Sequence, residues 1–298
     1  MVTWTRRLLV IGAFSTAAFA SAAADQTFDK RFSAPPGGHL TLQTDVGSVA
    51  ILGHDSREVV IHAEMSDSDH VQIAAEQNSS GVSVTGHVTE RDWFDWFHFS
   101  STHVRFTIDV PRDYPVEIKT SGGSIDVRNL ASAVQGTTAG GSITLRNVTG
   151  QIDAHTAGGG ISAERINGAA ALGTSGGSID IDASTGDLDV HTSGGSINLN
   201  SIDGRVKATT SGGSIHAEVH VNHGVYLTTA GGTITLLLPE DARASIDAGT
   251  SGGRTRSELP LSSTELAERS HLRGTINGGG EPIFLRTSGG SIHVEPLK

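Results

Sequence analysis

The chain has 298 residues, 38 glycines, no cysteine and a formal net charge of −11 at pH 7. The lack of cysteine excludes disulfides, thiol catalysis and cysteine-ligated metals. The negative charge, with no run of Lys and Arg to offset it, disfavours a nucleic-acid partner, because acidic proteins repel phosphate backbones.

Residues 1–24 have the pattern of a secretory signal peptide. Arg6 and Arg7 precede the apolar stretch 8–20, and small residues at 21–24 lead to Asp25. The apolar stretch is too short for a permanent membrane span, which needs about 20 residues. We therefore predict an exported mature protein without a transmembrane span, located in the periplasm, at the cell surface or outside the cell.

Residues 25–119 are rich in short alternating stretches that predict β-strands without a strict period. Residues 44–49 (Thr-Asp-Val-Gly-Ser-Val) resemble a degraded copy of a motif that recurs later in the chain. We predict that this region forms an irregular β-rich cap and first coils, continuous with the repeats that follow. A separate small β domain is the alternative.

Aromatic residues cluster within residues 93–99 of this region. Large aromatic side chains dominate many interfaces and can stack on sugar rings, so the cluster is a candidate binding patch. The alternative is that the rings plug an open end of the fold. The candidate residues are Trp93, Phe94, Trp96, Phe97 and Phe99.

From residue 120 a Thr-Ser/Ala-Gly-Gly motif recurs, and its first six copies are evenly spaced along the chain. Apolar residues fall five and seven positions after each motif Thr, and again at fourteen and sixteen, which predicts two half-buried strands per repeat. A short, strict period indicates a solenoid, whose coils bury apolar surface only by stacking on their neighbours. The motif threonines begin the copies at Thr120, Thr138, Thr156, Thr174, Thr192, Thr210, Thr229, Thr250 and Thr287.

The paired glycines are predicted to form a corner that needs positive φ or close backbone approach between coils. The neighbouring threonines and serines are expected to form hydroxyl ladders along the stack. The structural repeat glycines are Gly122, Gly123, Gly140, Gly141, Gly158, Gly159, Gly176, Gly177, Gly194, Gly195, Gly212, Gly213, Gly231, Gly232, Gly252, Gly253, Gly289 and Gly290.

Regular repeats thus cover residues 120–253, and residues 254–298 are predicted to hold an insertion and a closing coil. Within the insertion, residues 263–269 could form a short helix, and such insertions often cover the exposed strand edges at the end of a solenoid.

The Gly-Gly-Ser-Ile coils, the looser copy at residues 44–49, the strand 108–111 and the segment from Gly278 to Ile292 together resemble the bacterial "putative adhesin" family. The resemblance implies a β-solenoid domain of unknown function in an envelope or surface protein with a suspected adhesive role. It implies no catalytic residue. The fold prediction is an all-β single solenoid with coils of about 18 residues, each with two short strands.

The remaining candidate metal ligands and catalytic carboxylates are explained more simply as the solvent-exposed face of a sheet. His216, Glu218 and His220 alternate along one predicted strand with His223 just beyond, but neighbours at i and i+2 lie about 7 Å apart, which is long for one metal ion. His155 and His191 are expected about 9.6 Å apart, too far to share a ligand. Carboxylates that could serve a glycan-active enzyme are Asp180, Asp182, Asp187 and Asp189.

The sequence therefore predicts a non-enzymatic envelope or surface protein that displays a binding face to a surface protein or glycan. No catalytic residue, metal site or cofactor is predicted. The main alternative is an envelope scaffold that assembles through its solenoid ends, and a glycan-active enzyme is the third hypothesis.

Overall fold

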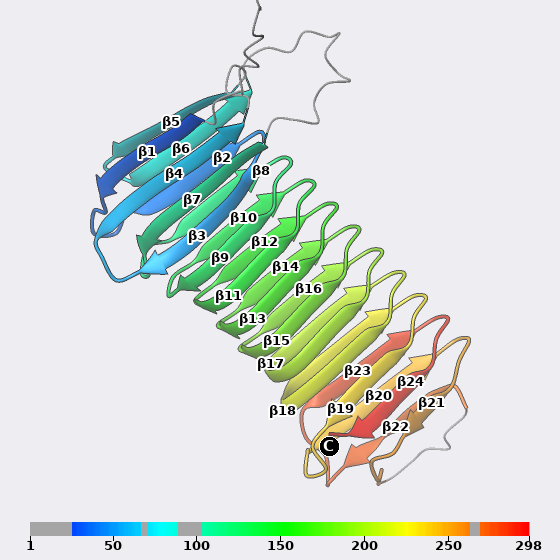
Figure 1. Cartoon of the computed structure of the whole chain (residues 1–298). Helices are drawn as coiled ribbons and strands as arrows, with labels where there is room; N and C mark the ends of the chain where they lie inside the picture. Colours follow the sequence, from blue (N-terminus) through cyan, green and yellow to red (C-terminus); the bar gives the residue numbers. More distant parts are fainter. Residues whose placement is uncertain (1–25, 67–70, 89–102, 263–268, 298) are drawn as a thin grey trace, which may run out of the picture.

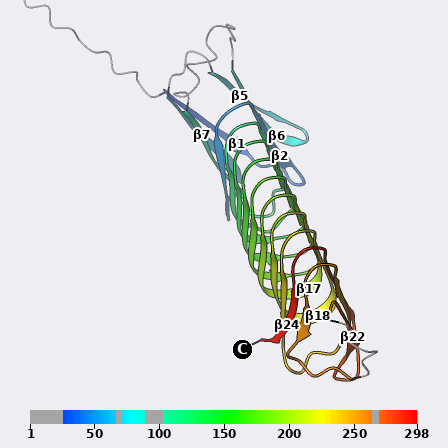
Figure 2. The same cartoon turned by 90° about the vertical axis from the view of Figure 1, so that its right-hand side faces the viewer.

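The computed structural model describes residues 26–66, 71–88, 103–262 and 269–297. These residues form 24 β-strands and no helix, so no helix within them is long and apolar enough to cross a membrane. The strands make a rod of stacked coils, with the N-terminal strands at one end and the C-terminus near the other (Figures 1 and 2). The predicted signal peptide lies outside the described residues.

Each regular coil contributes one strand to each of two sheets. Sheet 1 is hydrogen-bonded in the spatial order β5 (Val71–Asn78), β6 (Gly81–Val88), β2 (His39–Thr44), β8 (Val116–Thr120), β10 (Val134–Thr138), β12 (Ile152–Thr156), β14 (Ala170–Thr174), β16 (Leu188–Thr192), the second halves of β17 (Ile197–Thr210) and β18 (Ile215–Thr229), β23 (Pro282–Thr287), β20 (Ala244–Thr250) and β22 (His271–Ile276).

Sheet 2 follows the same axis. Its spatial order is β1 (Gln26–Ser33), β4 (Glu58–Ser66), β7 (His103–Pro111), β3 (Ser48–His54), β9 (Ile125–Leu130), β11 (Ile143–Thr149), β13 (Ile161–Asn167), β15 (Ile179–Thr185), the first halves of β17 and β18, β19 (Ile234–Leu238), β24 (Ile292–Pro296) and β21 (Thr255–Ser257). β17 and β18 run through a corner and join the two sheets.

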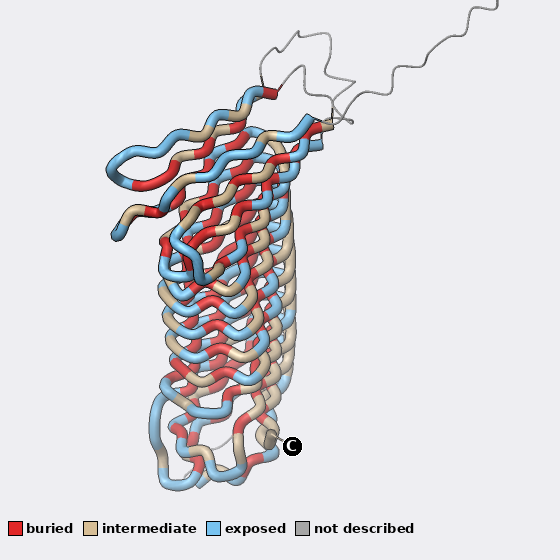
Figure 3. Tube along the Cα trace, turned by 60° about the vertical axis from the view of Figure 1, so that its left-hand side comes forward, coloured by how far each residue is buried: buried red, intermediate tan, exposed pale blue. Residues whose placement is uncertain are grey.

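The regular coils pair in parallel, and their register follows the period of the sequence. Ile143 pairs with Ile161, and Ile152 pairs with Ala170. Alternate side chains point into the space between the sheets, so buried and exposed residues alternate along every coil (Figure 3). The apolar positions that the period identified are the buried ones, including Ile181 from sheet 2 and Leu188 from sheet 1.

The motif Thr and the second motif Gly close one corner of each coil. The Thr192 hydroxyl donates to the Gly177 carbonyl of the preceding coil at 2.8 Å and accepts from the Gly195 N–H at 3.3 Å. The expected hydroxyl ladder is thus replaced by hydroxyl-to-backbone bonds. The same donation to a glycine carbonyl is made by Thr138, Thr156, Thr174, Thr210, Thr229, Thr250 and Thr287.

The second glycine of each pair is held by the closer approach. A Cβ added to Gly195 would lie 2.1 Å from the Gly177 carbonyl oxygen, whereas one added to Gly194 would lie 3.1 Å from the Gly176 carbonyl oxygen and one added to Gly122, in the first copy, would meet nothing within 4 Å. Neither position has positive φ; the left-handed residues occupy the opposite corner. They are Asn129, Asn147, Arg165, Ala183 and Ser201 at φ of 54–59°, and Gly150, Gly168, Gly186 and Gly204 three positions later along each turn.

The segment 44–49 occupies the corner of a coil directly beside the first regular one. β2 and β3 pair in parallel with β8 and β9, and the Thr120 hydroxyl donates to the Gly47 carbonyl at 3.2 Å. The described chain between β3 and β8 forms β4 to β7, which extend both sheets beyond this coil. The outermost strands, β5 and β1, are antiparallel to their neighbours.

The C-terminal coils are stacked in an order that differs from their order in the chain. β23 and β24 lie between the coil of β18 and β19 and the coil of β20 and β21 (Figure 1). The corner bonds follow this order, because Thr287 donates to Gly232 and Thr250 donates to Gly290. The last coil in the chain is therefore an inserted coil, and β22 lies antiparallel at the edge of sheet 1.

Candidate functional site

The outer face of sheet 1 carries two columns of side chains that run along the rod. One column lies one residue before each motif Thr, and the other lies three before it, because parallel in-register strands stack equivalent positions about 4.8 Å apart. The first column contains Lys119, Thr137, His155, Gly173, His191, Thr209, Thr228 and Arg286. The second contains Glu117, Gln135, Asp153, Ala171, Asp189, Lys207, Tyr226 and Phe284.

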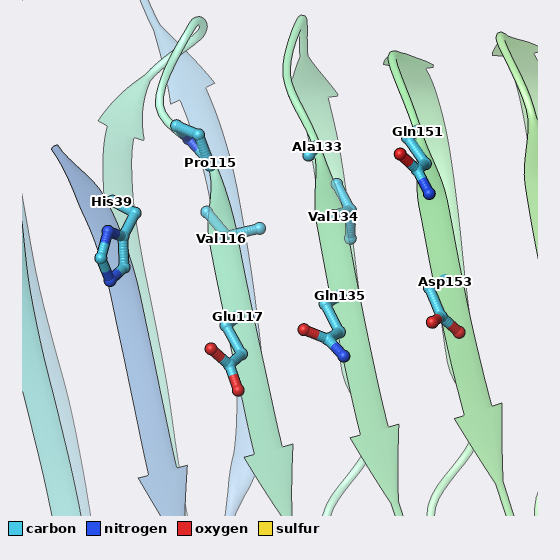
Figure 4. A pocket seen from close by; sticks show the side chains of 9 residues that line it. All are labelled: His39, Pro115, Val116, Glu117, Ala133, Val134, Gln135, Gln151 and Asp153. Atoms are coloured by element: carbon cyan, nitrogen blue, oxygen red, sulfur yellow. The ribbon is translucent and has the colours of Figure 1, made fainter. Parts of the chain in front are cut away.

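A shallow groove of about 390 Å³ lies over the N-terminal part of this face. Glu117, Gln135 and Asp153 stand side by side on β8, β10 and β12, and His39 of β2 borders them (Figure 4). Glu117 is already held by Lys119 at 2.6 Å. The row offers carboxylate and amide groups to solvent, and its polarity is that of a solvated sheet face.

A second groove, of about 450 Å³, contains two histidines that approach each other. His155 on β12 and His191 on β16 have ring centroids only 5.7 Å apart, so the separation of about 9.6 Å expected from strand spacing is wrong for the side chains. The intervening strand β14 presents Gly173 at the same column position. Because Gly173 has no side chain, the two imidazoles lean together and bury it, although it faces outward.

An exposed aromatic pair lies further along sheet 1. Tyr226 on β18 pairs in register with Phe284 on β23, and each is 40% exposed. Lys207 precedes the pair in the column and Asp247 follows it. The guanidinium of Arg286 lies 3.8 Å from the centroid of the Phe284 ring, a cation–π contact. The pair is thus a partly exposed apolar strip between charged neighbours, with one face of the Phe284 ring covered by Arg286.

Asp247 anchors the charged side of this strip. It accepts hydrogen bonds from Arg273 at 2.9 Å and from Arg286 at 2.8 Å, and its side chain is only 21% exposed. Burial would raise the pKa of the Asp247 carboxyl, but the hydrogen bonds and charges of Arg273 and Arg286 outweigh burial and lower this pKa. The carboxylate therefore holds Arg286 in place over Phe284.

The four candidate enzyme carboxylates do not form one group. Asp180 and Asp182 share the outer face of β15 in sheet 2, and Asp187 lies in the turn that follows. Asp189 lies on β16 of sheet 1 and pairs with Lys207 at 2.8 Å. Asp180 accepts a hydrogen bond from Asn198 at 2.7 Å. Carboxylates on the outer faces of opposite sheets cannot flank one glycosidic bond.

The histidines of β18 are likewise divided among separate partners. His216 lies 3.5 Å from Glu218, and His223 lies 3.4 Å from Asp203. No cluster of three or more His, Cys, Asp or Glu side chains that could hold a metal ion occurs in the described part of the chain.

The predicted aromatic patch, Trp93, Phe94, Trp96, Phe97 and Phe99, lies outside the described residues, as does the predicted helix apart from Arg269. The strip of Tyr226 and Phe284 was missed. A signal was present, because both residues stand three positions before a motif Thr, at Thr229 and Thr287. Aligning the irregular copies on their threonines would have placed both aromatic residues in one column, although only the structure makes them neighbours.

No curated protein matches this sequence. Solved structures of similar shape include two described as "putative adhesin", from Parabacteroides distasonis (12% identity, TM-score 0.48) and Parabacteroides merdae (11%, 0.47), and one described as "putative lipid binding protein" from Parabacteroides distasonis (12%, 0.42). In each case 92% of this chain is covered, against 98%, 97% and 97% of those chains. At these identities and TM-scores, the likenesses transfer no function.

The family comparison covers most of the chain. Residues 38–295, from the residue before β2 to Glu295 within β24, match the description Toastrack DUF4097. The match includes every motif copy and both columns of sheet 1. The chain therefore belongs to the Toastrack DUF4097 family.

Proposed function

We propose that this protein is a non-enzymatic binding module of the cell envelope or surface, which displays the outer face of sheet 1 to a glycan. The observation that carries the proposal is the strip of Tyr226 and Phe284, two exposed aromatic side chains in register on adjacent strands. Exposed aromatic pairs lose little conformational entropy on binding, because each side chain has two χ angles.

The surroundings of the strip suit a sugar ligand. Aromatic faces take the apolar faces of pyranose rings, while polar neighbours bond the hydroxyls. Lys207 borders the strip on one side, and Arg286 and Asp247 border it on the other. Since Arg286 is fixed by Asp247 at 2.8 Å, the strip is preorganised before a ligand arrives.

The ends of the rod argue against the scaffold alternative. Sheet 1 ends in the antiparallel strands β5 and β22, and sheet 2 begins with antiparallel β1 and ends with the three-residue β21. Parallel end-to-end stacking of copies would need open edges that continue the parallel register of the coils. Light scattering over a concentration series tests this point, and growth in length with concentration would favour the scaffold.

The location outside the cytoplasm rests on the signal-peptide pattern of residues 1–24. The acidic net charge and the lack of cysteine are compatible with that location. Cell fractionation of the full-length chain tests it. Recovery in the cytoplasm with the segment 1–24 intact would contradict this part of the proposal.

Glycan binding is tested on an array of envelope polysaccharides with the mature chain. The double variant Tyr226→Ala/Phe284→Ala should lose binding by at least about tenfold, because it removes both stacking surfaces. The matched control is Gln135→Ala/Thr137→Ala, which truncates the same two columns of sheet 1 elsewhere on the rod. A second variant, Trp93→Ala/Trp96→Ala, tests whether the other aromatic cluster takes part. Equal binding by the wild type and the Tyr226/Phe284 variant would overturn the assignment of the strip.

A further inference from the structure

A site that the proposed function does not use lies on the same face, at the two converging histidines. We propose that His155 and His191 bind a divalent transition-metal ion of the class that prefers imidazole, with Cu²⁺ bound most tightly. The proposal is independent of glycan binding.

The geometry comes from a gap in one column of sheet 1. The backbones of β12 and β16 are two strand spacings apart, about 9.6 Å, yet the ring centroids are 5.7 Å apart with the planes at 41°. The rings reach across β14 because its Gly173 leaves the column position free. Ala171, in the neighbouring column, is also small.

One ring nitrogen of each histidine lies beside Gly173 in this gap. A Cβ added to Gly173 would lie 2.5 Å from His155 Nδ1 and 2.6 Å from His191 Nε2, with His191 Cε1 nearer still at 2.3 Å. The separation of the two nitrogens therefore cannot exceed the sum of these distances. Metal–imidazole bonds are about 2.0–2.1 Å long, so rotation of the rings would allow both nitrogens to bind one ion on the solvent side of Gly173, clear of its Cα.

The carboxylate of Asp153 favours the tautomer of His155 that metal binding needs, with the proton on Nε2. Asp153 Oδ1 lies 2.7 Å from His155 Nε2, the ring nitrogen that faces away from the gap. The angle of this contact is outside hydrogen-bond geometry, and Asp153 Oδ1 is buried with no other partner among the described residues. A slight turn of the imidazole onto an ion would align the contact. A proton held on Nε2 leaves the Nδ1 lone pair facing the gap, as in carboxylate–histidine–metal arrangements.

The sequence around the gap repeats the same elements on either side. Asp-x-His-Thr occurs at residues 153–156 and again at 189–192, with Ala-Leu-Gly-Thr at 171–174 between them. The second aspartate, Asp189, is held by Lys207 at 2.8 Å and is not a free ligand. The site thus supplies two nitrogen ligands and leaves the other positions of the ion open to water along the groove. Such a mixed nitrogen and oxygen set favours Cu²⁺, which also binds tightest in the Irving–Williams order.

The test uses the mature chain without a histidine tag. Cu²⁺ is titrated and followed by electron paramagnetic resonance, which reports nitrogen ligands, and Zn²⁺ is titrated by calorimetry. We expect one saturable equivalent with imidazole nitrogen coupling. His155→Ala and His191→Ala should each weaken binding by at least about tenfold, and Asp153→Asn should weaken it by about tenfold.

Gly173→Ala is the sharpest variant, because it keeps both histidines and fills the gap with a methyl group that separates the rings. It should weaken binding as much as loss of one histidine. His216→Ala on sheet 2 is the matched control and should bind like the wild type. Circular dichroism verifies that each variant is folded. The proposal is overturned if wild type shows no saturable binding, if Gly173→Ala binds normally, or if His216→Ala weakens binding equally.

Discussion

The corner of each coil and the outer face of sheet 1 follow opposite rules. At the corner, the same Thr and Gly recur because each coil must bring its backbone against the previous one, with a Cβ at the second Gly of a pair as close as 1.8–2.3 Å to a backbone carbonyl oxygen. On the outer face no close backbone approach dictates the residue type, and the columns vary from coil to coil. Repetition therefore marks what stacking requires. Departures from it on the outer face, such as Gly173 and Phe284, mark the two places where we propose that ligands bind.

The largest expected effect is the difference in stability between alanine variants of the two glycines of one corner. Gly123→Ala places a Cβ 1.8 Å from the Gly47 carbonyl oxygen and should lower the free energy of unfolding by about 3 kcal/mol or more. The adjacent Gly122→Ala meets nothing within 4 Å and should change it by less than about 0.5 kcal/mol. Urea unfolding followed by circular dichroism measures both. Similar midpoints for the two variants would refute the close-approach explanation.

A smaller effect is expected where a corner hydroxyl is removed. Thr210→Val keeps the shape of the side chain but leaves the Gly195 carbonyl and the Gly213 N–H without their partner, at a cost of about 1–3 kcal/mol. Thr209→Val changes the exposed neighbour on the same strand and should be nearly neutral. Thermal unfolding compares the two. If Thr209→Val were the more damaging, the contrast between corner and outer face would be wrong.

On the outer face, Asp247 and its two arginine partners form an ion-pair cluster whose contribution to stability depends on pH. A carboxyl whose pKa is lowered on folding stabilises the folded state above its unfolded pKa of about 3.9, and this contribution disappears as the pH falls through the folded value. Wild type should therefore lose stability below about pH 4 in part through Asp247. Asp247→Asn should be less stable at pH 7 and should show a flatter pH profile below pH 4. Melting temperatures from pH 2 to 7 test this, with Asp180→Asn as the surface-charge control.

The smallest effect concerns the edge strand β1. Hydrogen bonds to Asp29 and then to Glu64 raise the pKa of His62, which joins β4 to β1 through a 2.7 Å contact with Asp29. A histidine whose pKa is raised on folding stabilises the folded state at a pH below its unfolded pKa of about 6.5. This contribution is lost as the pH rises through the pKa of the folded state. β1 should therefore exchange its amide protons faster at pH 8 than at pH 6, after correction for intrinsic rates. His62→Gln should remove the difference, and an unchanged difference would exclude His62 as its cause.

The sequence by itself determined the repeating part of this protein. A strict period with apolar residues at fixed positions specifies two inward-facing strands per coil, because only in-register stacking buries those positions together. The paired glycines at each corner were visible for the same reason. Even the weak copy at residues 44–49 could be recognised, since it keeps the Thr and one Gly that the corner uses.

Tertiary structure alone decided which coils and side chains meet outside the strict period. The insertion of β23 and β24 between earlier coils is fixed by their pairing with β18, β19, β20 and β21, and local periodicity does not encode that pairing. It brings Phe284 beside Tyr226, although the two residues are far apart in the chain. His155 and His191 meet because a side chain is absent between them, and strand spacing alone predicts them apart. Periodicity sets the backbone positions, whereas side-chain contacts also depend on the size of the residues on the adjacent strands.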